Sequence, residues 1–286
     1  MELFFRRYGN EGDQPLIILH GLFGLSDNWV SFARRIAMEG FEVFIIDQRN
    51  HGHSPHSPEF NYPVLTDDLF GFISDHEIEQ PVLLGHSMGG KVAMGYALQY
   101  PDSVKKLIVV DIGIKSYPPR TEHLRIIDAM RSVDLSSATH RNEIEQQLKP
   151  LIPSTRIRQF VMKNLHRNPD GRFNWLIDVE GIAMNIDFLM DGIEVDDKYE
   201  GPTLFIKGGA SDYILREDFK AIRKNFPNAE IITIDGASHW VHVEVPERFY
   251  QLVFGFITGT ASKFEMKKTN FTPKKPLNDR SSDSIH

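Results

Sequence analysis

A serine flanked by glycines is the feature of this sequence best suited to chemistry. Residues 85–90 read Gly-His-Ser-Met-Gly-Gly, directly after a short apolar run and directly before a stretch with helical spacing. Glycines two positions either side permit a sharp turn that leaves a serine hydroxyl exposed on strained backbone. The helix that follows offers backbone N–H groups to an anion. The pattern favours Ser87 as a nucleophile, and the competing interpretation is a chance glycine-rich turn.

Acyl transfer by a serine needs amide donors for the negatively charged oxygen of its intermediate. One donor usually follows the nucleophile and the other comes from a neighbouring loop. Residues 20–24 read His-Gly-Leu-Phe-Gly at the end of an earlier apolar run. We therefore expect the backbone N–H groups of Met88 and Leu22 to form an oxyanion hole. Taken alone, the His-Gly pair could be an ordinary turn.

A serine nucleophile also needs a base that titrates near neutral pH, which favours histidine. Among twelve histidines, His239 stands out within Gly-Ala-Ser-His-Trp at 236–240, after the last apolar run. That position fits the chain order of nucleophile, acid and histidine known for strand–turn–helix hydrolases. His242 is the second candidate, because it lies nearby but toward the next helix.

Two aspartates could orient the base. Asp111 ends the apolar run 107–110, and Asp212 follows the run 203–206 within Gly-Ala-Ser-Asp. Either carboxylate could reach the distal nitrogen of the imidazole and hold its tautomer. The competing role for Asp212 is a helix N-cap, and that for Asp111 is to satisfy loop backbone. The residues alone leave the choice open.

The elements that must position these groups follow from periodicity. Four unbroken apolar runs predict strands buried on both faces, as in a parallel sheet, at 16–19, 43–46, 82–84 and 107–110. Three stretches between them have helical spacing, at 28–39, 63–76 and 88–99. Each strand ends in a polar or glycine cluster, and ligands of such sheets bind beyond the carboxyl ends of the strands. The chemistry is expected at those ends.

The pattern changes after residue 115 and returns near 201. Amphipathic helices are predicted at Thr121–Arg131, Arg141–Leu148, Thr155–Leu165 and in a stretch that ends near Met190. Strands at 203–206 and 231–234 and helices at 215–225 and 246–257 then resume the alternation. We expect an α/β fold with a mostly parallel central sheet flanked by helices and a helical lid inserted after the sixth strand. The predicted core is 1–114 and 201–262, the lid is 115–200, and the polar tail 263–286 is expected to be disordered.

Composition excludes several classes of function. The 286 residues are 41% hydrophobic and 25% charged, with a net charge of −7, as in an ordinary globular protein without the basic face of a nucleic-acid binder. The absence of cysteine excludes disulfides, thiolate metal sites and cysteine nucleophiles, and it fits a reducing compartment. No apolar run is long enough to span a membrane, and the first residues lack a leader pattern. We expect a cytoplasmic protein, and no cofactor or metal is implied.

The chain resembles the α/β-hydrolase superfamily over roughly residues 3–260. Residues 47–55 are similar to the D-x-R-N-H-G-x-S-P loop of YbfF-like bacterial acyl esterases and their mitochondrial relatives, and 208–211 and 239–242 also resemble that group. The resemblance implies carboxylesterase or acyl-CoA thioesterase activity. It also favours Asp111 as the acid, because members often lack an aspartate after the Gly-Gly-x-Ser segment. Here both positions are acidic.

The predicted function is hydrolysis of an ester or thioester through an acyl-enzyme, with a small-molecule acyl substrate as the expected partner. A serine at position 87 disfavours dehalogenases and epoxide hydrolases of this fold, which use an aspartate nucleophile. A cofactor-free haloperoxidase or a carbon–carbon bond hydrolase could use the same triad. A non-enzymatic ligand-binding protein on the same scaffold is the alternative from another class.

The substrate pocket is less well defined by the sequence. The pocket candidates beside the triad are Phe23, His86, Trp175 and Trp240. Apolar residues of the predicted lid could line an acyl tunnel, although their helical spacing favours a lid core: Phe160, Trp175, Met184, Phe188 and Met190. The basic residues Arg156 and Arg158 could meet a CoA phosphate.

Overall fold

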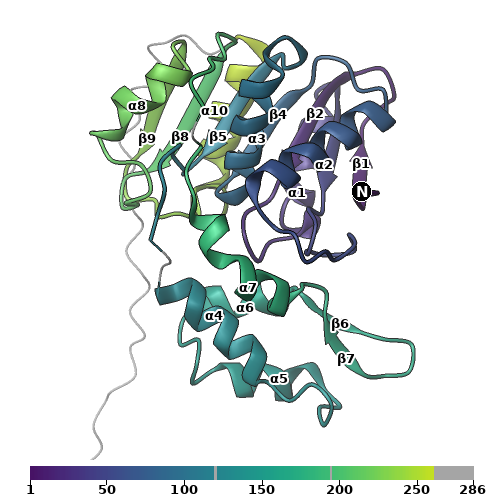
Figure 1. The fold of residues 1–286 in the computed structure, drawn as a ribbon. Coiled ribbons are helices and arrows are strands. Elements are labelled where there is room, and N and C mark those ends of the chain that lie inside the picture. Colours follow the sequence, from purple (N-terminus) through teal and green to yellow (C-terminus); the bar gives the residue numbers. More distant parts are fainter. Residues whose placement is uncertain (119–120, 194, 261–286) are drawn as a thin grey trace, which may run out of the picture.

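A seven-stranded sheet forms the centre of the molecule in the computed structural model, which describes residues 1–118, 121–193 and 195–260 (Figure 1). The expected disordered tail at 263–286 lies outside the described residues. The strands lie in the order β1-β3-β2-β4-β5-β8-β9. Their bounds are β1 Phe5–Tyr8, β2 Gln14–Leu19, β3 Phe41–Ile46, β4 Val82–His86, β5 Lys106–Val110, β8 Thr203–Gly208 and β9 Ala229–Ile234. Within this sheet of the described residues, β1 alone pairs antiparallel, so the predicted mostly parallel sheet is confirmed.

Helices cover both faces of the sheet, because each central strand is apolar on both sides. Leu16 and Ile18 of β2 pack in one cluster, and Ile17 and Leu19 pack in the other, as expected of side chains that alternate across a strand. The first cluster contains α1 Val30–Ala37, α9 Val241–Glu244 and α10 Pro246–Thr258. The second contains α2 Tyr62–Asp75, α3 Met88–Gln99 and α8 Asp218–Asn225. Two short 3₁₀ helices, Ser26–Asn28 and Pro101–Ser103, complete this part.

The chain between β5 and β8, here called the inserted segment (residues 115–200), packs at one end of the sheet (Figure 1). Its elements are α4 Thr121–Ser132, α5 Arg141–Leu148, α6 Thr155–Met162, β6 Leu165–Arg167, β7 Phe173–Trp175 and α7 Val179–Met190. The prediction that it follows the sixth strand was wrong. It follows the fifth, because only β1 precedes the strand at Gln14–Leu19.

A small β-hairpin interrupts the helices of the inserted segment. The helix predicted at Thr155–Leu165 ends at Met162, and Leu165–Arg167 then pairs antiparallel with Phe173–Trp175. Three-residue strands carry too few positions to show an alternating pattern, so this hairpin could not be predicted from periodicity.

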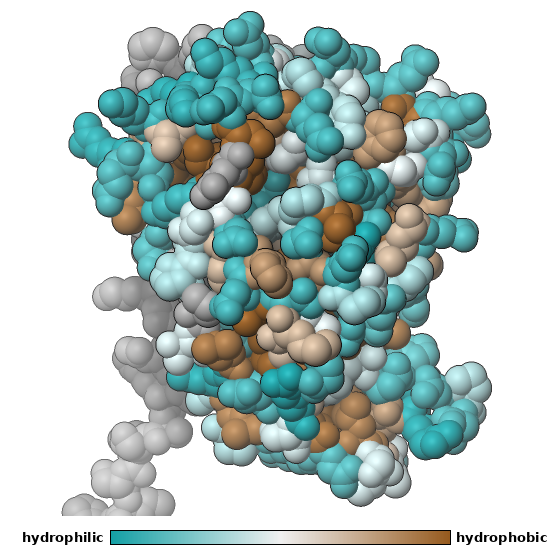
Figure 2. Space-filling view, in the orientation of Figure 1, coloured by the Kyte–Doolittle hydropathy of each residue, from teal (hydrophilic) through white to brown (hydrophobic). Residues whose placement is uncertain are grey.

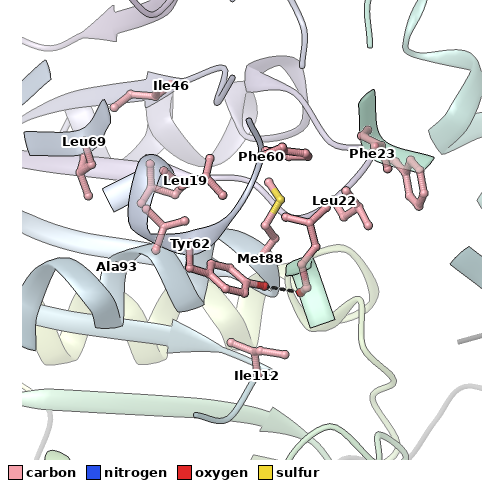
Figure 3. Packing of buried hydrophobic residues seen from close by; sticks show 14 of the residues in the cluster. Leu19, Leu22, Phe23, Ile46, Phe60, Tyr62, Leu69, Met88, Ala93 and Ile112 are labelled. Carbon is pink, nitrogen blue, oxygen red and sulfur yellow. Dashed lines mark hydrogen bonds between the residues drawn. The ribbon is translucent and has the colours of Figure 1, made fainter. Parts of the chain in front are cut away.

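Two chain segments, residues 114–117 and 190–193, connect the inserted segment to the sheet and are hydrogen bonded to each other. We call this pair of segments the neck. The Ile193 N–H donates to the Ile114 carbonyl at 2.7 Å, and the Tyr117 N–H donates to the Met190 carbonyl at 2.8 Å. The Tyr62 hydroxyl of α2 donates to the carbonyl of Leu189 in α7 at 2.7 Å (Figure 3). The first two bonds tie the two chain segments of the neck to each other, and the third ties the end of α7 to α2.

Apolar surface is limited on the face shown in Figure 2, where hydrophilic residues predominate and hydrophobic ones appear in small groups. Within the described ranges, no helix is both long enough and apolar enough to cross a membrane.

Candidate active site

Ser87 sits on strained backbone between β4 and α3. Its φ of 53° and ψ of −120° place it in a region that non-glycine residues rarely adopt. A Cβ atom at Gly85 would lie 2.2 Å from the Gly89 carbonyl oxygen, and one at Gly89 would lie 2.4 Å from the Leu19 carbonyl oxygen. Only glycine fits at either position, so the two glycines of the motif are what allow the turn to close.

His239 is held by a buried carboxylate. Its Nδ1 lies 2.8 Å from Oδ2 of Asp111, which is fully buried. The Asp111 carboxylate also accepts from the Gly208 N–H at 2.8 Å and from the Ser211 hydroxyl. Because an ionised carboxylate can only accept, Nδ1 carries the proton and Nε2 is the nitrogen free to act as a base.

Of the two candidate acids, Asp111 contacts His239 and Asp212 lies in another part of the site. Asp212 is exposed and lies in the wall of the cavity that contains Ser87 and His239. The sheet order explains the difference, because β5 lies between β4 and β8, so the residue that ends β5 lies beside the Ser87 turn.

Other rings fix the orientation of His239. Tyr213 stacks on its imidazole, with ring centroids 4.0 Å apart and planes at 19°. Nε2 of His86 lies 3.0 Å from the His239 carbonyl oxygen, and since that oxygen only accepts, His86 donates. Burial holds the pKa of His86 well below its usual value, so its ring is neutral. The residue before Ser87 therefore ties the end of β4 to the His239 loop.

His242, the second candidate for the base, lies elsewhere. Its ring stacks on Trp29 with centroids 4.3 Å apart and planes at 9°. Burial lowers the pKa of His242 to about 3. His242, the alternative base, is not among the residues that line the cavity of Ser87, and its ring stacks on Trp29 instead of lying against Asp111.

Ser87 and His239 line a single cavity of about 280 Å³. Three of the four predicted pocket residues line it as well: Phe23, His86 and Trp240. The inserted segment contributes the far wall through Glu122, His123, Ile126, Arg156, Ile157 and Phe160. Within the described ranges, no group of three or more metal-ligating side chains gathers anywhere. The cavity brings together the Ser87 hydroxyl and the His239 imidazole, whose Nδ1 is bound by the buried Asp111 carboxylate.

Trp175, the fourth predicted pocket residue, is not among the residues that line the cavity of Ser87 and His239. It belongs to β7, and its indole N–H donates to the Met130 carbonyl at 3.1 Å. Met184 and Phe188 on α7 are 69% and 54% exposed, which excludes them from a buried acyl tunnel. Of the apolar candidates in the inserted segment, Phe160 alone lines the described cavity.

The loop expected to supply the second amide donor lies directly against Ser87. A Cβ atom at Gly21 would approach the Ser87 Cβ to 3.1 Å. Leu22 and Met88 are both buried, and Met88 is the first residue of α3. The two N–H groups after Leu22 are used within the loop region, since Phe23 donates to Nε2 of His51 at 3.2 Å and Gly24 donates to the Gly21 carbonyl at 2.9 Å.

A second cavity of about 710 Å³ adjoins the first. The two share Asn28, Trp29, Arg156, Phe160 and Trp240 in their walls. The rings of Phe160 and Trp240 meet edge to face, with centroids 4.4 Å apart, on the boundary between the cavities.

The two arginines singled out in the sequence have different surroundings. Arg156 lines both cavities and forms an ion pair with Glu244. Arg158 is buried, and its guanidinium donates to the Ile152 carbonyl at 2.9 Å and lies 3.5 Å from Glu145. The suggestion that Arg158 meets a phosphate was therefore wrong, because its donors hold the loop before α6.

Several residues of the site carried no signal in the sequence. Tyr213 follows Asp212 directly and could have been noticed through that position. Trp29, His123 and Ile126 had no such marker. For His123 and Ile126 the reason is that the face of α4 that meets the cavity depends on how the inserted segment docks on the sheet.

Comparisons with known proteins agree with this architecture. A family model described as "alpha/beta hydrolase fold" matches residues 14–246. The zebrafish (Danio rerio) protein named sn-1-specific diacylglycerol lipase ABHD11 is 39% identical over 263 residues, covering 90% of this chain and 83% of its own length. Esterase YbfF of Escherichia coli (strain K12) is 32% identical over 235 residues, covering 82% of this chain and 89% of its own. The solved structure of a marine microorganism esterase superposes with a TM-score of 0.86 at 45% identity, covering 89% of this chain and 99% of that one. This chain belongs to the α/β-hydrolase fold family.

Proposed function

We propose that this protein is a serine hydrolase that cleaves carboxylic esters or thioesters through an acyl-enzyme on Ser87. One observation carries the proposal: Ser87, on a strained turn, and His239, hydrogen bonded to the buried Asp111, line the same cavity. The names of the relatives, which include esterases and a lipase, support an activity of the carboxylesterase type.

In the acylation step, the Ser87 hydroxyl attacks the substrate carbonyl carbon while Nε2 of His239 takes its proton. The carbonyl oxygen becomes an oxyanion, and we assign the N–H groups of Leu22 and Met88 as its donors. Each such donor contributes about 3–4 kcal/mol to the transition state in comparable sites. The carbon–oxygen or carbon–sulfur bond then breaks, and His239 gives the proton to the leaving group.

In the deacylation step, water replaces the leaving group in the cavity. Nε2 of His239 removes a proton from that water, which attacks the acyl carbon, and Ser87 recovers its proton as the acid product leaves. Asp111 keeps the imidazole in the required tautomer throughout and stabilises the transient imidazolium. All proton transfers in both steps pass through Nε2 of His239.

We also propose that the inserted segment, 115–200, acts as the lid of a core made by 1–114 and 201–262. Its support is the wall that α4 and α6 contribute to the cavity through Ile126, Ile157 and Phe160. The lipase name of the zebrafish relative makes glycerol esters a substrate class to test alongside simple esters. A cytoplasmic location is part of the same proposal and is supported by the absence of cysteine.

The test is pre-steady-state hydrolysis of p-nitrophenyl butyrate by the wild-type chain and by Ser87→Ala. An acyl-enzyme predicts a burst of nitrophenol equal to the protein concentration, followed by slower turnover, and Ser87→Ala should show neither. Turnover that survives in Ser87→Ala would remove the proposed nucleophile. Tight binding of esters by the wild-type chain without any burst or turnover would favour a ligand-binding protein on this scaffold.

A further inference from the structure

The loop that carries the proposed oxyanion donor is strained at its next residue. Phe23 follows Leu22 and has a φ of 63°, in the left-handed region. A bulky side chain in that region costs about 1–2 kcal/mol, so the surrounding contacts must hold Phe23 there. The Phe23 N–H and the Phe23 carbonyl oxygen are each hydrogen bonded to a buried side chain, and these two bonds hold the residue in place.

His51 holds the first of these groups. Its Nδ1 lies 3.0 Å from the Arg49 carbonyl oxygen, which only accepts, so Nδ1 carries the proton and Nε2 accepts from the Phe23 N–H at 3.2 Å. Burial keeps the pKa of His51 well below its usual value, so Nε2 stays an acceptor. Arg49 is in turn fixed by Asp68 of α2, at 2.5 and 2.8 Å.

Asn164 of the inserted segment holds the second group. Its side chain is fully buried, and Nδ2 donates to the Phe23 carbonyl at 2.9 Å and to the Val161 carbonyl at 3.3 Å. Two carbonyl oxygens take both hydrogens of the amide, which fixes its orientation. The backbone of Asn164 is anchored as well, because its N–H donates to Val161 at 3.0 Å and its carbonyl accepts from Leu176 at 2.8 Å.

We infer that Asn164 is a positioning residue through which the inserted segment sets the geometry of the Leu22 oxyanion donor. The inference rests on the proposed function. With the peptide after Leu22 bound to His51 and the next one bound to Asn164, the loop has one conformation in which Leu22 faces the cavity. An oxyanion donor acts only within about 2.7–3.1 Å of the developing charge, so a small shift of this loop costs rate rather than substrate binding.

The inserted segment offers a matched control. Asn185 of α7 is also buried, and its Nδ2 donates to the Pro58 carbonyl of a core loop at 3.0 Å and to the Gly181 carbonyl at 2.8 Å. It joins the inserted segment to the core through the same chemistry as Asn164. Asn185, however, binds the Pro58 carbonyl and not the loop beside Ser87. Replacing Asn185 therefore shows the effect of losing one contact between the inserted segment and the core without disturbing that loop.

The experiment compares Asn164→Leu with Asn185→Leu in the full chain, using p-nitrophenyl butyrate. We expect Asn164→Leu to lower kcat by about tenfold or more per active site titrated with a fluorophosphonate, with KM within about twofold. Inhibition by an arylboronic acid, which mimics the tetrahedral intermediate, should weaken by a similar factor. Asn185→Leu should keep kcat and boronate affinity near those of the wild-type chain.

Equal kcat values for the two variants would overturn the inference, as would a loss in Asn164→Leu that appears only in KM. If Asn164→Leu fails to fold, Asn164→Ala removes the amide donor without adding bulk or charge, and the same loss in kcat is expected. A wild-type chain without turnover would contradict the proposed function itself. Normal turnover in a folded Asn164→Leu protein would contradict only the role of Asn164.

Discussion

Three residues of the site are not glycine and yet adopt left-handed backbone: Phe23 at 63°, Ser87 at 53° and Asp111 at 51°. Each such conformation costs about 1–2 kcal/mol, and it persists only where the surroundings impose it. Ser87 and Asp111 each begin the turn that follows a buried strand, β4 and β5. The strain therefore lies where the parallel strands present side chains to the cavity.

Asp111→Asn is expected to lower kcat/KM by about a thousandfold or more, because an amide beside Nδ1 no longer enforces the tautomer that leaves Nε2 basic. Asp212→Asn should change kcat/KM by less than about threefold. Steady-state hydrolysis of p-nitrophenyl butyrate at pH 7 measures both. A larger loss in Asp212→Asn than in Asp111→Asn would transfer the acid's role to Asp212.

Some residues of the site could be predicted from the sequence and others could not, for a physical reason. Ser87 and His239 are marked by local patterns, since a nucleophile turn needs its glycines and the histidine follows the last strand. The choice between Asp111 and Asp212 depends on which strand end lies nearer to His239, and strand order is a long-range property. Asn164 was not predicted at all, because a single buried asparagine in a helix-rich segment has no local pattern.

At the scale of elements, the order of the sheet explains how distant residues meet. β4, β5, β8 and β9 are successive neighbours and run parallel, so their carboxyl ends share one edge. Apolar runs predicted the ends of each of these strands to within two residues, because strands buried on both faces have unbroken apolar sequence. The hairpin β6–β7 and the exposed face of α7 were not predicted, since short strands and helix docking leave no such run.

The Phe160–Trp240 pair on the boundary between the two cavities leads to a prediction about the length of the substrate's acyl chain. We expect that removing the Phe160 ring, whose centroid lies 4.4 Å from that of Trp240, joins the 280 Å³ cavity to the 710 Å³ one. Phe160→Ala should therefore raise kcat/KM for p-nitrophenyl laurate relative to the butyrate, by several-fold. The control is Phe188→Ala on α7, where the ring is largely exposed and lines neither described cavity. An unchanged laurate-to-butyrate ratio in Phe160→Ala would show that this pair does not limit acyl length.

At the scale of the whole molecule, four histidines whose pKa is lowered in the folded state link stability to pH. The four are His20, His51, His86 and His242, and loss of hydration is the main reason that the pKa of each is lowered. A histidine with a lowered folded-state pKa binds its proton more readily in the unfolded chain. The free energy of unfolding therefore falls as the pH decreases below about 6.5, and the loss continues down to the folded-state pKa.

His242→Phe should reduce this sensitivity to acid. The pKa of His242 falls from 6.5 to about 3 on folding, so its share of the loss between pH 7 and pH 5 is about 2 kcal/mol. A phenyl ring can retain the stack on Trp29 without a titrating group. Urea unfolding at pH 7 and pH 5 gives the difference for the wild-type chain, His242→Phe and the exposed control His56→Phe. Equal pH dependence in all three would contradict a neutral, buried His242.

The central claim is a covalent acyl group on one oxygen atom, and acid quench followed by mass spectrometry tests it directly. The chain is mixed with p-nitrophenyl butyrate, quenched within the burst and digested. We predict a butyryl adduct on the peptide that contains Ser87, absent from Ser87→Ala and lost when substrate is exhausted. An adduct on another residue, or steady turnover with no adduct at any quench time, would contradict the account.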